Sequence, residues 1–299
     1  MSITPPSKGF IFWPVGNGDS TTVRISESTY FQIDLRHMAK SEEDDDTAWP
    51  VIDELIEILP KVNGVPYLST FVLTHPDKDH CQGFKDLLSQ AVISELWLSP
   101  RIFREYKENA DLCEDAEAFY EEAMRRVKLA IENPSNLGAG DRIRIIGYDE
   151  LLEEDEFEGF PSRLLTTPGN TITMVDDKDV YDDFEAFVHA PFKEDSYGER
   201  NDCSIALQIS LKSGNEVGRA LLMGDLQYPI IRKIFNRSCR DTLYWNVLLA
   251  PHHCSKSVMY WKDEGEEEET LRADIVKDIG NHSLAPGYIV SSSEPINPR

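Results

Sequence analysis

Residues 74–80, THPDKDH, contain two histidines and two aspartates, and they directly follow the apolar run TFVL. Imidazole nitrogens and carboxylate oxygens are ligands for Zn, Mn or Fe, and a larger share of oxygen favours Mn or Mg. In a turn after a strand, neighbouring side chains can converge, whereas a continuous strand sends neighbours to opposite faces. The segment therefore indicates a metal site. A solvated or helix-capping turn is the alternative.

Two further polar clusters end apolar strands. In LLMGD, Asp225 follows a glycine that permits close approach of the backbone or a ligand. In LLAPHHCSKS, His252 and His253 follow an apolar run. Each cluster alone has a structural explanation, as a Gly-Asp turn or a pair of strand-end histidines. Three such clusters in one chain favour a shared site.

Apolar runs predict the elements that must position these clusters. Strands are predicted at residues 9–15, 20–25, 30–35, 68–73, 91–99, 203–211, 219–225 and 244–251, with shorter ones within 141–147 and 186–191. Helices are predicted at 49–62 and 83–90, and residues 101–132 are predicted to form one long amphipathic helix. Polar clusters at strand ends suit two packed sheets flanked by helices, with a site built from loops along one edge.

Composition limits the classes of function. The chain has 299 residues and a net charge of −24, which argues against a broad basic surface for nucleic acid. Bound divalent cations can nevertheless reverse the local field inside a cleft. No apolar run is long enough to span a membrane, and the N-terminus does not resemble a signal peptide. The five cysteines have no paired spacing, so we expect reduced thiols and a cytoplasmic protein that binds no membrane.

Six motifs occur in the order found in the metallo-β-lactamase superfamily: GNGDSTTV (16–23), FQIDL (31–35), THPDKDHCQG (74–83), NDCSIAL (201–207), ALLMGD (220–225) and APHHCSKS (250–257). The chain most resembles the hydrolase domain of ComEC-type DNA-uptake proteins and their free-standing soluble relatives. Those proteins carry a VGQGDS-like opening, an HxDxDH core, an NxxS strand, an LxxGD strand and an HHGS motif. The resemblance covers roughly residues 9 to 293 of this sequence.

The resemblance implies an α+β fold, the four-layer αβ/βα sandwich in which two packed mixed sheets are flanked by helices. It implies a single domain over residues 1–299, with insertions near 40–48, 101–135, 148–198 and 262–270. The sequence breaks off just after a predicted strand, which is consistent with the N-terminal part of a longer protein.

Ligand roles also follow from the resemblance. It implies that His75 and Asp77 hold one metal ion, that Asp79 and His80 hold the other, and that Asp225 bridges both. The implied cofactors are two divalent ions, Mn or Zn, with Mg as a further candidate. The same resemblance makes Asp79, His80 and Asp225 the catalytic centre.

The remaining motif residues are implied to support the site. His252 and His253 complete the second metal site or contact a substrate phosphate, and Asp34 orients the metal loop through hydrogen bonds. Residues expected near the metals or the substrate are Asp19, Ser20, Asn201, Ser204, Ser255 and Lys256.

The chain departs from the family pattern in three places. Asp77 stands where the wider superfamily has a second histidine, as it does in the ComEC-type proteins, and Cys254 replaces the glycine of HHGS. A GHP-like segment expected after the last strand is missing, which leaves one wall of the site unaccounted for.

Four other residues capable of chemistry are expected to have simpler roles. His189 is interpreted as a structural histidine at a strand end, and Cys81 as a small buried residue. His37 and His282 lie in polar stretches and are expected to be exposed.

The leading hypothesis is a metal-dependent phosphodiesterase, a nuclease acting on DNA, in which Asp79 or Asp225 accepts the proton of an attacking water. A free-standing version would serve DNA processing or defence against foreign DNA, alone or with a protein partner. One alternative is a hydrolase of a small phosphoester or nucleotide second messenger. The other is a non-catalytic partner subunit with a structural metal site.

Overall fold

The computed structural model describes residues 3–38, 48–108, 111–263 and 265–294. The acidic insertion predicted near residues 40–48 lies almost entirely outside these ranges. No helix within the described ranges is both long and apolar enough to cross a membrane.

The first sheet is mixed and has eight strands in the order β1-β2-β3-β5-β6-β7-β8, with β4 paired to β5. The strands β3, β5, β6, β7 and β8 run parallel to one another. Their bounds are β1 Gly9–Phe12, β2 Thr21–Arg24, β3 Tyr30–Ile33, β4 Lys61–Val62, β5 Val65–Leu73, β6 Val92–Leu98, β7 Arg142–Ile146 and β8 Leu165–Thr166. The parallel direction puts Asp34, after β3, and His75, after β5, at the same edge of the sheet.

The second sheet has six strands in the order β18-β15-β14-β13-β12-β9. Their bounds are β9 Thr171–Ile172, β12 Phe184–Ala190, β13 Ala206–Ser213, β14 Glu216–Leu222, β15 Trp245–Leu249 and β18 Ser283–Val290. Because β14 and β15 are parallel, Asp225 and the His252–His253 pair follow strands that end at one edge. Two short ribbons, β10–β11 (Met174–Val175 and Lys178–Asp179) and β16–β17 (Tyr260–Trp261 and Thr270–Leu271), lie outside the sheets.

Three apolar cores define four layers. Between the sheets, the Phe31 ring lies 4.9 Å from that of Trp97 in the first sheet and 5.1 Å from that of Phe184 in the second. Successive side chains of β3 point to opposite faces of the sheet. Phe31 and Ile33 enter this inner core, and Tyr30 enters the outer core under the helices.

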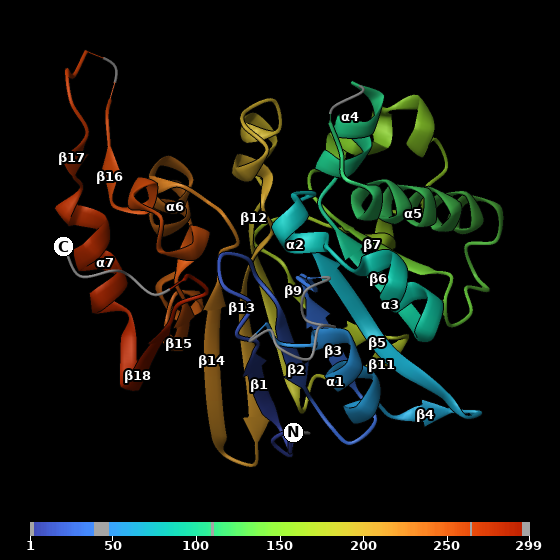
Figure 1. Ribbon diagram of the computed structural model, residues 1–299. Coiled ribbons are helices and arrows are strands. Elements are labelled where there is room, and N and C mark those ends of the chain that lie inside the picture. Colours follow the sequence, from blue (N-terminus) through green and yellow to red (C-terminus); the bar gives the residue numbers. More distant parts are fainter. Residues whose placement is uncertain (1–2, 39–47, 109–110, 264, 295–299) are drawn as a thin grey trace.

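Helices cover the outer face of each sheet (Figure 1). The helices are α1 Val51–Ile58, α2 Lys78–Cys81, α3 Phe84–Gln90, α4 Arg101–Lys107, α5 Glu114–Glu132, α6 Tyr228–Arg237 and α7 Ala273–Asn281. In Figure 1, α3, α4 and α5 lie on one side of the paired sheets and α6 and α7 on the other. The predicted four-layer α+β sandwich is confirmed.

The prediction of one helix over residues 101–132 is wrong. Helix α4 ends at Lys107, and α5 begins at Glu114 after an extended residue, Cys113. The Asp115 side chain accepts hydrogen bonds from the backbone N–H groups of Gly83 and Lys85, at 3.0 and 2.9 Å, so the start of α5 is fixed to the start of α3. Residues 148–198, predicted to be an insertion, contain β8, β9 and β12 of the two sheets.

The inner core predicts that alanine substitution lowers the free energy of unfolding much more at Leu207 than at Leu271. Replacing buried Leu207, between the sheets, by alanine removes packing and leaves a cavity, so we expect a loss of about 2–5 kcal/mol in the free energy of unfolding. Leu271→Ala is the matched control, because Leu271 is 51% exposed, and it should cost less than about 1 kcal/mol. Urea denaturation measures both. Equal losses in the two variants would contradict this assignment of the core.

Candidate metal centre

Four loops from both sheets meet at one edge of the sandwich. They follow β3, β5, β14 and β15, and they carry the side chains of all three sequence clusters. The shared edge follows from strand direction, because the carboxyl ends of the parallel strands in each sheet face the same way.

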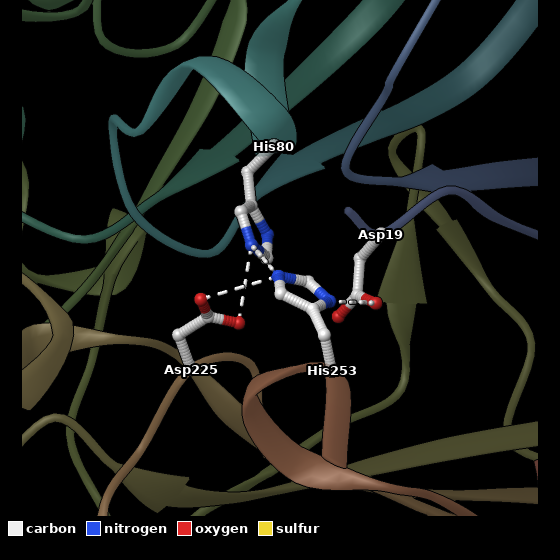
Figure 2. Close-up of side chains that lie close together, drawn as sticks. All are labelled: Asp19, His80, Asp225 and His253. Atoms are coloured by element: carbon white, nitrogen blue, oxygen red, sulfur yellow. Dashed lines mark hydrogen bonds and ion pairs between the residues drawn. The ribbon is translucent and has the colours of Figure 1, made fainter. Parts of the chain in front are cut away.

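A compact group of four side chains occupies this edge. Among the described residues, Asp19, His80, Asp225 and His253 can each offer one donor atom so that all four atoms lie within 4.8 Å of one another. The Nε2 of His80 lies 3.1 Å from Oδ1 of Asp225, and Nε2 of His253 lies 3.3 Å from Oδ2 of Asp225. Figure 2 shows both imidazole rings between the carboxylates of Asp225 and Asp19. These four residues could hold a metal ion.

A second group of side chains also approaches the Asp225 carboxylate. The Nε2 of His75 lies 3.4 Å from Oδ2 of Asp77 and 3.9 Å from Oδ2 of Asp225. The Nε2 of His252 lies 3.7 Å from the same Asp225 oxygen. The Asp225 carboxylate thus lies near histidines of both groups. Asp79 approaches the first group, with Oδ2 3.3 Å from Nε2 of His253.

Several potential ligand atoms at this edge make no hydrogen bond, although charged groups lie near them. The Nε2 of His75, Oδ1 of Asp225 and Oδ1 of Asp19 are buried and make no hydrogen bond. Buried polar atoms are normally satisfied, and unpaired ones cost free energy unless a ligand completes them. Since all three are nitrogen or carboxylate donors directed at one small region, the residues fit a divalent ion.

Asp34 fixes the orientation of the metal loop, as the sequence suggests. Its Oδ1 accepts from the backbone N–H of Thr74 at 2.8 Å, and its Oδ2 accepts from the Thr74 hydroxyl at 2.7 Å. The same Oδ2 lies 2.8 Å from Nδ1 of His80. This contact holds the His80 ring so that Nε2 faces the cluster.

Arg200 was not predicted from the sequence, yet it orients Asp77. Its guanidinium donates to Oδ1 of Asp77 at 2.6 Å and to Oε2 of Glu105 at 3.0 Å. The bond leaves Oδ2 of Asp77 facing His75. The one feature of the sequence that places Arg200 near the site is its position directly before the NxxS motif.

The loop that carries the histidine pair has a strained backbone. His252, His253 and Cys254 have φ of 48°, 51° and 63°, a region that side chains other than glycine rarely adopt. Such strain persists where the surrounding structure imposes it, often at functional sites. Cys254 therefore occupies a position that suits the glycine of the family motif. The Ser257 hydroxyl lies 3.3 Å from Nδ1 of His252, and Ser255 in turn bonds Ser257.

The wall left unaccounted for in the sequence is supplied by residues that follow β18. The Ser292 hydroxyl lies 3.1 Å from Nδ1 of His253. The Ser292 carbonyl accepts from the Gly18 N–H at 3.4 Å, and the Glu294 N–H donates to the Asn17 side chain at 2.9 Å. This segment and the opening loop thus enclose His253 without a GHP-like motif.

Charge at the centre is strongly negative in the absence of a cation. Three carboxylates, those of Asp19, Asp79 and Asp225, surround the His253 ring. Burial disfavours the imidazolium, but these carboxylates outweigh burial and raise the pKa of His253 to about 11. Burial likewise opposes charge on His80, and Asp225 is the main group that raises its pKa well above the ordinary value. Both shifts have one cause: the pocket attracts positive charge.

Several predicted residues support the site without facing the cluster. Ser20 accepts a hydrogen bond from Gln32, at 2.9 Å, beneath the metal loop. Ser204 is fully buried, and its hydroxyl lies against Gly224 without a hydrogen-bond partner. Asn201 begins a short helix and uses its carbonyl to accept from the Ser204 N–H. The structure directs Lys256 toward Glu269, 3.4 Å away.

The histidines outside the motifs have mixed outcomes. His189 is structural, as predicted, since it is buried with Nδ1 2.7 Å from the Ser238 hydroxyl and Nε2 3.0 Å from the Thr242 carbonyl. The expectation of exposure is wrong for His37, which is 7% exposed. It is also wrong for His282, which is half-buried, with Nδ1 2.7 Å from the Asp278 carbonyl oxygen.

Cys81 is buried, as expected, but it is not isolated. Its sulfur lies 3.5 Å from that of Cys113, at the start of α5.

Solved metallo-β-lactamase structures are similar to this chain in fold. The Rm3 metallo-β-lactamase has a TM-score of 0.47 and 10% identity, over 92% of this chain and 89% of that one. The subclass B3 enzyme BJP-1 of Bradyrhizobium japonicum has a TM-score of 0.43 and 13% identity, over 93% and 89%. The class B3 di-zinc metallo-β-lactamase LRA-12 from an Alaskan soil metagenome has a TM-score of 0.39 and 10% identity, over 94% of this chain and 96% of that one. This likeness concerns the fold alone. No model of a protein family and no curated protein sequence matches the chain.

The unpartnered atoms predict a metal-dependent gain in stability. Mn or Zn should raise the melting temperature of the protein, because an ion that binds only the folded state stabilises it. Asp225→Asn should abolish most of this rise and lower the metal content measured by elemental analysis. Asp182→Ala, at an exposed position, is the control and should behave like the unchanged protein. Equal metal content in both variants would contradict the site.

His189 predicts a loss of stability in acid. Burial lowers its pKa to about 4, below the ordinary 6.5, so the unfolded chain binds a proton at a higher pH than the folded one. Stability therefore falls as the pH drops from 6.5 toward 4, and between pH 7 and pH 5 this residue costs about 2 kcal/mol. Urea denaturation of His189→Gln should show a correspondingly smaller difference between the two pH values. If both proteins lost the same stability, His189 would not be held neutral.

Proposed function

We propose that this protein is a metal-dependent phosphodiester hydrolase, a nuclease that acts on DNA and uses two divalent ions. The observation that carries the proposal is the convergence of four histidines on the Asp225 carboxylate, with Asp77 close to His75 and Asp79 close to His253. The order of the HxDxDH, GD and HH motifs supports the same reading. On this proposal His75, Asp77 and His252 hold one ion, and Asp79, His80, His253 and Asp19 hold the other, with Asp225 shared.

The bound ions would supply activation of a water molecule and stabilisation of charge on the diester oxygens. The residues of the chain have defined tasks around them. Asp34 holds His80 with Nε2 toward the cluster, and Arg200 holds Asp77 toward His75. Asp79 is the best-placed carboxylate to take a proton from the attacking water, because its side chain is 36% exposed whereas that of Asp225 is 5% exposed.

An acidic site needs the ions before it can accept a phosphodiester. Without them, the converging carboxylates would repel the anionic substrate. The net charge of −24 supports the same expectation, because so acidic a composition argues against a broad basic surface that would hold DNA by its phosphates. We therefore expect hydrolysis to be strictly metal-dependent.

A small nucleotide is the second candidate substrate. The charge of −24 favours it, because a small anion needs only the ions and a few nearby donors. Comparing the rates on single-stranded DNA, double-stranded DNA and a set of cyclic dinucleotides separates the two candidates. If the protein hydrolysed a cyclic dinucleotide faster than DNA, the cyclic dinucleotide and not DNA would be the substrate. The notion of cellular DNA processing or defence, with or without a protein partner, rests on DNA being preferred.

The proposal predicts the behaviour of two site variants. With Mn, Asp79→Ala and His80→Ala should each lower kcat/KM on DNA by about a hundredfold or more, because each removes a side chain that holds an ion. Asp182→Ala should retain the rate of the unchanged protein. Gel assays of labelled DNA measure all three. Cleavage that persists in both site variants would point to a contaminating nuclease and contradict the proposal.

A further inference from the structure

A pocket of about 380 Å³ adjoins the metal centre on the side of Asp79. Its lining residues are Arg36, Met38, Lys78, Asp79 and Gln82. Two cationic side chains and one amide thus share a cavity wall with a residue of the candidate metal site. Neither Arg36 nor Lys78 has any role in the site as described so far.

Arg36 is held in this pocket by its backbone neighbours. The N–H of Leu35 donates to the His80 carbonyl and that of His37 to the Gln82 carbonyl, both at 2.8 Å. The chain on either side of Arg36 is therefore bonded directly to the metal loop. These hydrogen bonds fix the backbone at Arg36 relative to the metal loop.

Gly18 closes the opposite side of the Arg36 side chain. A Cβ atom on Gly18 would lie 2.3 Å from Cδ of Arg36 and 2.8 Å from the carbonyl oxygen of Asp79. Only glycine permits the opening loop to approach this closely. The guanidinium is consequently confined between that loop and the metal loop.

The confined guanidinium lacks the partners that such a group normally has. The Nε and Nη1 atoms of Arg36 are buried and make no hydrogen bond. No described residue forms an ion pair with Arg36 or Lys78, although the chain has 54 acidic residues to 30 basic ones. Arg36 as a whole is half-buried, and a cation in such a place without a charged partner is stabilised by an anionic ligand in the pocket that it lines.

We propose that this pocket binds a second phosphate group of the substrate, adjacent to the one that is hydrolysed. This inference rests on the proposed function, because the metal centre is what makes a neighbouring phosphate the relevant anion. Arg36, which lines the pocket, would donate to the phosphate through its guanidinium, whose planar array of N–H groups suits phosphate oxygens. Lys78 would add charge at the rim.

Calorimetric titration of the Mn-loaded protein with two nucleotides tests the proposal. Thymidine 5′-phosphate offers one phosphate and thymidine 3′,5′-bisphosphate offers two. The unchanged protein should bind the bisphosphate about tenfold tighter or more, and Arg36→Met should remove this advantage. Lys61→Met, which removes an exposed charge in β4, is the control and should keep it.

Lys78→Gln provides an independent variant should Arg36→Met fold poorly, and it should reduce the same advantage. The phosphorothioate analogue of the trinucleotide TpTpT, which has internal diesters only and resists hydrolysis, distinguishes two sources of the phosphate. If Arg36→Met weakens its binding, the pocket takes the backbone of a strand, and if only bisphosphate binding weakens, it takes a terminal phosphate.

Two results would overturn the proposal: no preference for the bisphosphate in the unchanged protein, or the same preference in Arg36→Met and Lys78→Gln. A preference that depends on Arg36, in a protein that cleaves no diester, would instead sustain the phosphate pocket and refute the hydrolase.

Discussion

Five aspartates converge on one partly buried edge of this protein, and their mutual repulsion is the constraint on which the site depends. Asp19, Asp34 and Asp225 are at most 4% exposed, while Asp77 and Asp79 lie at the rim. Carboxylates this close cannot all remain charged in a medium of low dielectric without cations among them. The raised pKa of His253 and the bond from Arg200 to Asp77 are two partial answers that the chain itself supplies.

A pair of divalent ions would offset the repulsion between these carboxylates more completely. The Nε2 atoms of His80 and His253 lie close to each other and to Asp225 at the centre, whereas their Nδ1 atoms contact residues around it. His80 uses Nδ1 for Asp34, and His253 uses Nδ1 for Ser292, so that each ring presents Nε2 inward. The strained backbone at His252 and His253 also orients the two rings, because a relaxed backbone would direct them away from the centre. The site is thus preorganised by hydrogen bonds that do not themselves involve an ion.

Much of this arrangement could be predicted from the sequence, because it depends on local patterns. Buried parallel strands are continuous apolar runs, and their direction brings the polar residues at their ends to one edge. The contacts of Arg200, Arg36 and Ser292 could not be predicted, since loops of variable path bring them to the site from distant parts of the chain. The break between α4 and α5 was missed because helical periodicity continues across it, and the anchor of Asp115 to α3 is a tertiary contact.

Anomalous diffraction from crystals soaked in manganese tests the central claim most directly. The account predicts strong peaks at the edge, within about 2.0–2.4 Å of Nε2 of His80 and of a carboxylate oxygen of Asp225. Ions bound only to exposed acidic side chains, with no peak between Asp225 and the two histidines His80 and His253, would contradict it.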